Sequence, residues 1–457
     1  MMMNEMSKEQ QKTLELVMIE QMVKPEHLLR KIDSYIDFSF IYGLVESLYS
    51  QTTGRPSVDP VVLIKMLLLQ NLYGIPSERR LMDEIHHNMA YRWFLGFGIT
   101  TKIPDHSIFS QNRIRRFTDS TLFEDIFYEI LKQADQYGLI KGKIVYTDST
   151  HIRADASNSK YSSVEEEKLT GRNNDLERIN TIRERHGHKP LKSKEDKLET
   201  KRKKVSTTDP DSGYMNRDRK PEGFYYLDHR TVDSSYNIIL DTYVSAGNVH
   251  DATPYLERID HVREVVKSLP NTQEIKYTCA DAGYFNNKVL LGLKERHLTP
   301  IIGAVRHHKK PGKDSKYWFT YDLIEDVYVC KAGQLLEYQT TTREGYSSYE
   351  SDPEVCRSCE HKEQCIFDGA TKRTLRRHIY EEYKDEAREL LKTEKGKALY
   401  ARRKETVERS FADSKTHHGY RYARYRGCDK VQSQAYLVAT IQNIKKMALV
   451  LDGLGVK

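Results

Sequence analysis

Two short apolar runs, far apart in the chain, each lead into an aspartate. Lys143–Thr147 precedes Asp148, and Glu274–Ala280 precedes Asp281. Both runs contain β-branched and aromatic residues, which favour strands with a buried face. We therefore expect each aspartate where its strand ends, at the edge of a sheet where ligands and reacting groups collect in α/β folds. A strand-terminal aspartate is also a common turn residue, so the pattern requires further acidic partners.

The segments between and after these runs predict a mixed sheet. Residues 223–227 and 236–244 predict an antiparallel hairpin, and Gly247–Asp251 is expected to open a helix. A helix over 287–296 and a strand over 299–304 follow the second aspartate. Since no glycine-rich phosphate loop accompanies these elements, their order indicates a mixed α/β layout and not a doubly wound nucleotide-binding fold.

Residues 1–138 predict an all-helical domain. Asp59-Pro60 and Ser77 have the character of helix N-caps. A further helix is expected from Pro104, and it carries Arg113 and Arg116 on its later turns. Short helices with an arginine-bearing member suit a helix-turn-helix-like DNA-binding module. An ordinary helical bundle fits the same pattern equally well.

The rest of the chain divides by composition. We expect the first part of the α/β core at 139–308, interrupted at about 157–222 by a charged, exposed insertion that is partly helical and partly disordered. A small cysteine-bearing insertion follows at 309–380, and helices return over 381–457. Two helices are expected there, from about Lys395 to Lys415 and from Val431 to Leu451.

Charge and hydropathy exclude some classes of protein. The 457 residues carry a formal net charge of +7, with basic clusters at Lys201–Lys204 and Arg421–Arg426. Such clusters fit a polyanionic partner or a solvated surface. No run approaches the ~18 apolar residues of a membrane span, and the N-terminus lacks the apolar segment of a signal peptide. We therefore expect a cytoplasmic protein with no membrane partner.

Four of the six cysteines lie close together in the chain. Cys356 and Cys359 have the two-residue spacing of a zinc knuckle, Cys365 follows within reach, and Cys330 lies on an expected strand and turn. These thiols could complete a tetrahedral structural zinc site, and free reduced thiols are the alternative. Six cysteines in so long a chain argue against a disulfide scaffold.

A third carboxylate stands on a late helix. Val407 and Phe411 form an apolar stripe at i, i+4, while Glu408 and Lys415 share another face at i, i+7. With the two aspartates, this glutamate gives three carboxylates that can hold two Mg²⁺ ions about 3.5–4 Å apart. Such a pair activates water or a 3′-hydroxyl and stabilises the leaving oxygen of a phosphodiester. The pattern therefore indicates cutting and joining of DNA strands.

In this order the motifs resemble those of the DDE transposases of bacterial insertion sequences. The matching stretches are Tyr146–His151, Ala280–Tyr284 and Lys404–Lys415, together with Gly54–Pro60, Pro104–Ser107 and Gly247–Asp251. The resemblance implies an RNase H-like mixed sheet flanked by helices, after a helical N-terminal domain. It also implies that Asp148, Asp281 and Glu408 are the catalytic triad and bind two Mg²⁺ or Mn²⁺ ions.

Many relatives have a last motif of the form Tyr-x2-Arg-x3-Glu-x6-Lys. Glu408 and Lys415 keep that spacing, and the resemblance implies that Lys415 contacts a terminal phosphate of the transposon end. A solvated helix lysine is the alternative. Ala401 stands where the motif has its tyrosine, and Lys404 stands where it has its arginine. The nearest tyrosine and arginine, Tyr400 and Arg403, each lie one position earlier. The roles of a tyrosine and an arginine are therefore open.

Arginine and tyrosine alternate just after the glutamate-bearing helix. The segment Gly419–Gly427 places Arg421, Arg424 and Arg426 among tyrosines. Interleaved cations and aromatic rings suit contact with a DNA backbone. Packing of the tyrosines in the protein interior is the alternative.

The function expected from the resemblance is that of an insertion-sequence transposase acting on double-stranded DNA. It would bind the element's terminal inverted repeats and catalyse Mg²⁺-dependent strand cleavage and strand transfer into target DNA. A homodimer or larger synaptic complex is expected, in a bacterial cytoplasm and associated with the nucleoid when bound to DNA. Two alternatives stay open: a catalytically silent DNA-binding protein derived from a transposase, and a nuclease without a joining step.

Overall fold

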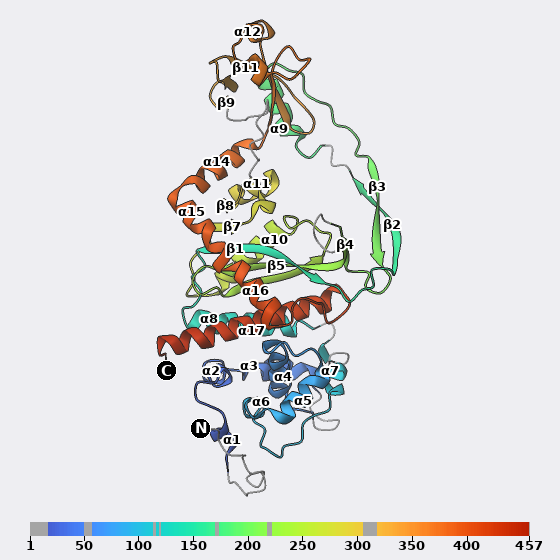
Figure 1. Ribbon diagram of the computed structural model, residues 1–457, viewed down its shortest axis with the longest axis vertical. Coiled ribbons are helices and arrows are strands. Elements are labelled where there is room, and N and C mark those ends of the chain that lie inside the picture. The colour runs from blue at the N-terminus through green and yellow to red at the C-terminus, as the bar shows by residue number, and fades with distance from the viewer. Residues whose placement is uncertain are drawn as a thin grey trace, which may run out of the picture. The chain divides into compact units, whose positions relative to one another are not determined.

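The computed structural model describes residues 17–49, 57–112, 116–117, 120–169, 173–216, 222–304 and 318–456. The chain divides into two compact units, each assembled from separate segments of the sequence. Unit 1 comprises Met1–Tyr161, Ser206–Tyr277 and Arg402–Lys457, and unit 2 comprises Ser162–Val205 and Thr278–Ala401. The expected α/β class with a helical N-terminal region is confirmed (Figure 1).

The N-terminal part of unit 1 is helical. Its elements are α1 (Ile19–Met22), α2 (Leu28–Tyr35), α3 (Phe40–Val45), η2 (Glu46–Leu48), α4 (Pro60–Leu72), α5 (Glu78–His87), α6 (Met89–Phe94), α7 (Ser107–Asn112) and α8 (Leu122–Gln136). Both expected N-caps are confirmed, since Asp59 accepts hydrogen bonds from two amides of α4 and Ser77 accepts one from Arg80 in α5. Helix α4 is apolar on most of its surface and is correspondingly buried, which makes it the centre of this helical region.

Helix α17 (Cys428–Leu454) joins the helical region to the sheet of unit 1. It is buried over most of its length and contacts α2, α4, α8 and strand β6. In Figure 1 it runs between the N-terminal helices and the sheet. The helix is longer than the expected Val431–Leu451 at both ends. An asparagine in it, Asn443, exchanges two hydrogen bonds with the backbone of Ile239, so the helix is also fixed to β6 by polar contacts.

The sheet of unit 1 is built around a long central strand. Strand β5 (Gly223–Asp233) pairs antiparallel with β1 (Ile144–Arg153), β4 (Gly213–Met215) and β6 (Ile239–Ala246). The expected hairpin is therefore confirmed as β5 and β6. The helix expected to open at Gly247–Asp251 begins later, because turns occupy those residues and α10 spans Tyr255–Ser268.

Unit 2 contains two short strands, a five-stranded antiparallel sheet and several helices. The first group is β7 (Tyr277–Ala280), η4 (Ala282–Tyr284), α11 (Asn287–Glu295) and β8 (Thr299–Ile302). The five-stranded sheet has the order β13-β12-β11-β10-β9, from strands β9 (Phe319–Asp322), β10 (Val327–Cys330), β11 (Leu335–Thr341), β12 (Tyr346–Ser351) and β13 (Thr374–His378). The helices are α9 (Leu176–Arg185), α12 (Pro353–Arg357), α13 (Lys362–Cys365), α14 (Glu381–Lys392) and α15 (Glu394–Ala401).

The charged insertion forms a two-stranded ribbon from β2 (Tyr161–Leu169) and β3 (Leu198–Ser206). The basic cluster at Lys201–Lys204 lies on β3, opposite acidic residues of β2. Arg202 pairs with Glu165 at 3.0 Å, and Lys203 pairs with Glu166 at 2.8 Å. The positive charge of this cluster is thus partly neutralised within the ribbon, which weakens its case as a binding surface for a polyanion.

Within the described part of the chain, no helix combines the length and hydropathy needed to cross a membrane.

Candidate active site

Asp148 lies in the interior of a strand and not at its end. Strand β1 continues through five more residues to Arg153, because Ser149 and Thr150 extend the ladder with β5 instead of turning. The prediction that the strand ends at Asp148 was therefore wrong, and Asp148 stands opposite Arg230 of β5. One carboxylate oxygen of Asp148, Oδ1, accepts a hydrogen bond from the amide of Ser149 at 2.8 Å.

Glu408 lies in the first turn of a short helix, α16 (Val407–His417). The single helix expected from about Lys395 to Lys415 is instead broken into α15, the 3₁₀ helix η6 (Arg402–Glu405) and α16. The break falls at Thr406, whose φ of −108° and ψ of −99° are not helical. Glu408 is half-exposed, so its carboxylate is accessible to solvent.

Arg403 connects the two carboxylates of unit 1. Its Nη2 donates to Asp148 Oδ2 at 2.9 Å, and its Nη1 lies 3.6 Å from Glu408 Oε1. The guanidinium is largely buried, with 7% of the side chain exposed. We call this arrangement of Asp148, Arg403 and Glu408 the Arg403 bridge. It shows that the two carboxylates, from a central strand and a late helix, point toward one position.

The break at Thr406 explains how Arg403 reaches Glu408. In a continuous α-helix, residues five apart lie about 140° from each other around the axis and cannot meet. The family motif therefore places its arginine four residues before the glutamate, where this chain has Lys404. Because the 3₁₀ turn and Thr406 interrupt the helix, Arg403 takes the position beside the glutamate, while Lys404 is exposed. The arginine one position away in the sequence is thus the one that contacts the acidic residues.

Tyr400, the tyrosine one position away from the motif, belongs to unit 2. It packs over Gly303 just after β8, where a side chain larger than hydrogen would collide with the tyrosine ring and hydroxyl. Within unit 2 this tyrosine therefore has a packing role.

Asp281 also lies in unit 2, immediately after β7. The expectation of a strand followed by an aspartate is confirmed here. The side chain caps the short helix η4, with Oδ1 accepting a hydrogen bond from the amide of Gly283 at 2.8 Å. Unit 1 brings Asp148 and Glu408 together, and convergence of Asp281 with them stays a prediction.

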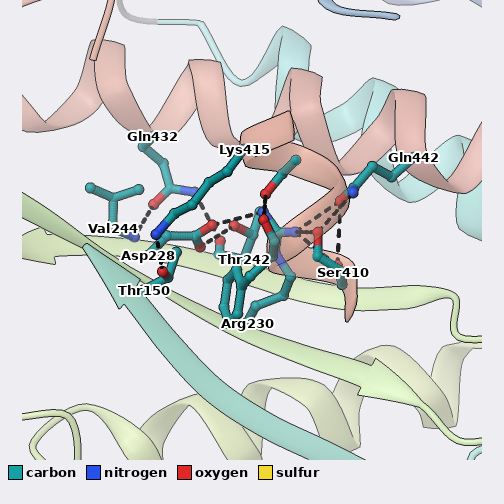
Figure 2. A network of polar contacts seen from close by, with 11 residues as sticks. Thr150, Asp228, Arg230, Thr242, Val244, Ser410, Lys415, Gln432 and Gln442 are labelled. Atoms are coloured by element: carbon teal, nitrogen blue, oxygen red, sulfur yellow. Dashed lines mark hydrogen bonds and ion pairs between the residues drawn. The ribbon is translucent and has the colours of Figure 1, made fainter. Parts of the chain in front are cut away.

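Lys415 extends from α16 toward the strand that carries Asp148. Its Nζ donates to Thr150 Oγ1 at 2.5 Å, two residues beyond the aspartate (Figure 2). Glu408 and Lys415 thus come from the same helix and both approach β1. Contact of Lys415 with a DNA phosphate stays a prediction.

A buried polar network that the sequence analysis missed fixes the helix of Glu408 to the sheet. Arg230 Nη1 donates to Ser410 Oγ at 2.9 Å and to Gln442 Oε1 at 2.8 Å, and Nη2 pairs with Asp228 Oδ2 at 2.8 Å (Figure 2). Thr242 Oγ1 donates to the other Asp228 oxygen at 2.7 Å. Arg230 and Asp228 are both fully buried. The network joins β5 and β6 to α16 and α17, two residues from Glu408.

The sequence feature that could have predicted this network is the run Asp228-His229-Arg230 inside a strand of mainly apolar and aromatic residues. Charged residues in a strand that pairs on both edges require buried partners. His229 is also buried, and burial lowers its pKa to about 4. His229 Nε2 forms a hydrogen bond with Ser245 Oγ at 2.9 Å and so links β5 to β6.

The arginine–tyrosine segment contains both buried and exposed residues. Its backbone adds to the end of β1, since Arg153 donates to the carbonyl of Arg421 and accepts from the amide of Ala423. Tyr420 is fully buried, so the packing alternative holds for this tyrosine, whereas Tyr422 is exposed.

The three arginines of that segment differ in their surroundings. Arg426 pairs with Asp155 at 2.9 Å, and Arg421 donates to the carbonyl of Lys415 at 3.2 Å; both side chains are exposed. Burial lowers the pKa of Arg424. Arg421 and Arg426 are therefore the better placed to meet a DNA backbone, and all three assignments stay predictions.

Of the two N-terminal arginines, Arg116 lies among the described residues. Arg116 donates to Asn112 Oδ1 at 2.5 Å, and its guanidinium lies 4.0 Å from the ring centre of Tyr49. These contacts are intramolecular and fit the bundle alternative. Arg113 lies outside the described residues.

The four clustered cysteines line one hollow of about 500 Å³ in unit 2. Cys330 ends β10, Cys356 lies in α12, Cys365 ends α13, and Cys359 lies between these two helices. Burial raises the pKa of the Cys365 thiol. Among the described residues, no group of three histidine, cysteine or acidic side chains is arranged to hold a metal ion. The structure therefore gathers the thiols around one space without bringing them to coordinating positions.

Two family models match this chain. The Transposase domain (DUF772) model matches residues 17–115, and the Transposase DDE domain model matches residues 329–448, which include Glu408 and Lys415. The two matches support the identification of a DDE transposase in the segments that they cover.

Solved structures give similarities at low sequence identity. A piggyBac transposase synaptic complex with hairpin DNA is 11% identical, covering 94% of this chain and 76% of that chain with a TM-score of 0.34. A Mos1 transposase paired-end complex with the left transposon end is 11% identical, covering 57% of this chain and 62% of that chain with a TM-score of 0.17. No significant match is found among curated proteins.

Proposed function

We propose that this transposase is an active enzyme that cuts and joins double-stranded DNA at an Asp148, Asp281 and Glu408 centre. The observation that carries the proposal is the Arg403 bridge: two carboxylates that are far apart in the sequence share one cation. A site that attracts a guanidinium to two carboxylates has the charge and the ligand type that Mg²⁺ or Mn²⁺ prefers. The exposed Glu408 carboxylate leaves the position open to solvent and substrate.

Asp148, Asp281 and Glu408 would hold two divalent ions in this proposal. When bound, such ions activate an attacking water or 3′-hydroxyl and stabilise the leaving oxygen of the phosphodiester. Residues of the chain supply the rest. Lys415, on the same helix as Glu408, would contact a phosphate of the DNA end, and Arg421 and Arg426 would contact the adjoining backbone. The substrates would be the terminal inverted repeats of the element and then target DNA, held in a homodimer or larger synaptic complex in the bacterial cytoplasm.

The test uses a plasmid that carries the coding sequence with its natural flanking DNA, incubated with purified protein and Mg²⁺ or Mn²⁺. The expected products are strands cut at the element ends and strands joined to new target sites. Asp281→Asn and Glu408→Gln should remove both products, whereas Glu405→Gln, an exposed glutamate in η6, should retain them. Binding without cleavage in either metal would favour the catalytically silent alternative. Cleavage without joined products would favour the nuclease alternative.

We also propose a structural zinc ion in the cysteine-lined hollow of unit 2. The segment 352–373 has little apolar core, since Ile366 is its one buried hydrophobic residue and both Val355 and Phe367 are exposed. Its helices α12 and α13 have five and four residues, lengths that are not stable alone. Small modules of this kind are commonly stabilised by a metal. Coordination by Cys330, Cys356, Cys359 and Cys365 would require rotation of the side chains toward the centre of the hollow.

A further inference from the structure

We propose that Arg403 is an internal counter-ion that occupies the carboxylate pair in the metal-free protein and leaves Asp148 when a divalent ion binds. The inference rests on the proposed function of Asp148 and Glu408 as metal ligands. It adds a role that the family motif does not assign to this position, because the motif's arginine position is Lys404 in this chain.

Both carboxylate oxygens of Asp148 accept a hydrogen bond in the metal-free protein. Oδ1 accepts the amide of Ser149, and Oδ2 accepts Nη2 of Arg403. A divalent ion bound to Oδ2 would lie within a few ångströms of the guanidinium, and two cations so close repel each other strongly. The metal and Arg403 are therefore alternatives at this atom.

Asp148 and Glu408 are a pair of like charges, and like charges in a partly buried site destabilise each other. One guanidinium between them removes most of this repulsion but leaves a net charge of about −1 on the three groups. The bridge therefore stabilises the metal-free protein and still attracts further cations.

Residue Arg403 lies in η6, a single 3₁₀ turn, and not within the helix of Glu408. The neighbouring Arg402 donates to the carbonyl of Ser234 at 2.6 Å, which holds the turn against the sheet of unit 1. The backbone at Arg403 is thus held in place by a contact that does not depend on the bond between Arg403 and Asp148.

The test is Mn²⁺ affinity measured by calorimetric titration of the full chain without DNA, for the wild type and for Arg403→Gln. Removal of the competing guanidinium should tighten Mn²⁺ binding by roughly tenfold, which is ~1.4 kcal/mol and near the lower end for a hydrogen bond to a charged group. The metal-free Arg403→Gln protein should melt at a lower temperature than wild type, and Mn²⁺ should raise its melting temperature more. Arg403→Lys keeps the charge and should give an intermediate affinity.

The matched control is Lys404→Gln, which removes an exposed cation from the same turn without removing a contact to either carboxylate. It should leave the Mn²⁺ affinity unchanged. Unchanged or weaker binding by a folded Arg403→Gln protein would overturn the inference, and so would a stronger effect from Lys404→Gln. Failure of the proposed metal site itself has a different signature, because Asp148→Asn would then bind Mn²⁺ as tightly as wild type.

Discussion

Arg230 should be the residue of unit 1 at which a single substitution costs the most stability without touching the proposed metal ligands. Replacement by Met keeps much of the apolar stem but removes the partners of Asp228, Ser410 and Gln442. Asp228 would keep its hydrogen bond from Thr242, and its charge would remain fully buried. Breaking a buried ion pair by removing one partner costs ~3–5 kcal/mol, so we expect a loss in that range.

The assay is guanidinium-induced unfolding of the full chain, followed by circular dichroism. The control is Arg202→Met, which removes an exposed pair with Glu165 on the β2–β3 ribbon and should change stability by less than ~1 kcal/mol. A second comparison is the double variant Arg230→Met with Asp228→Leu. It removes both buried charges and should recover a large part of the loss.

The reasoning is refuted by either of two results. A loss of less than ~1 kcal/mol for Arg230→Met would mean that the buried pair contributes no more than an exposed one. A double variant as unstable as the single one would mean that the lost hydrogen bonds to Ser410 and Gln442, and not the unpaired Asp228 charge, set the cost.

Three further predictions concern other parts of the chain. Asp148→Asn should abolish strand cleavage, because asparagine keeps the shape of the side chain but not its charge. The affinity for the element ends in a gel-shift assay should stay within about twofold of wild type. Retained cleavage would show that Asp148 is not a catalytic residue. Wild-type protein prepared without chelator should contain about one zinc ion per chain by elemental analysis, and the double variant Cys356→Ser with Cys359→Ser should contain none. Absence of zinc from the wild type would favour the free-thiol alternative. Burial lowers the pKa of His418 to about 4, whereas an unfolded histidine titrates near 6.5. The contribution of neutral His418 to the free energy of unfolding is therefore complete above pH 6.5 and is lost as the pH falls toward 4, by up to ~3 kcal/mol. In thermal melts between pH 4 and 7, the melting temperature of His418→Gln should fall less with decreasing pH than that of wild type. An equal fall of the melting temperature in both proteins would contradict the assignment.

Local features of this fold were predictable because their causes are local. A cap residue acts on amides two or three positions away, so Asp59 and Ser77 could be recognised from a few residues of sequence. The apolar and aromatic runs of β5 and β6 and the aspartate after β7 are signals of the same kind. Each of these signals lies within a single element or turn.

The errors arose where tertiary contacts decide the local structure. Ser149 is a residue type common in turns, yet it extends β1 together with Thr150 because β5 supplies a partner along the strand. The sequence around Thr406 predicts one continuous helix, yet the helix is interrupted at this residue. Contact with residues far along the chain overrides propensity at both places.

The position of Glu408 follows from that break. If α15 continued through Thr406, the direction of its axis would determine where Glu408 lies. The helix is interrupted at Thr406, so α16 has an axis of its own. Its placement depends instead on the contacts of its own residues: Ser410 with Arg230 and Gln442, and Lys415 with Thr150. These contacts are made to β5, α17 and β1, the strand of Asp148. The distance between the two carboxylates is therefore set by the buried core of unit 1, and the exchange of Arg403 for a metal ion can proceed without movement of the helix.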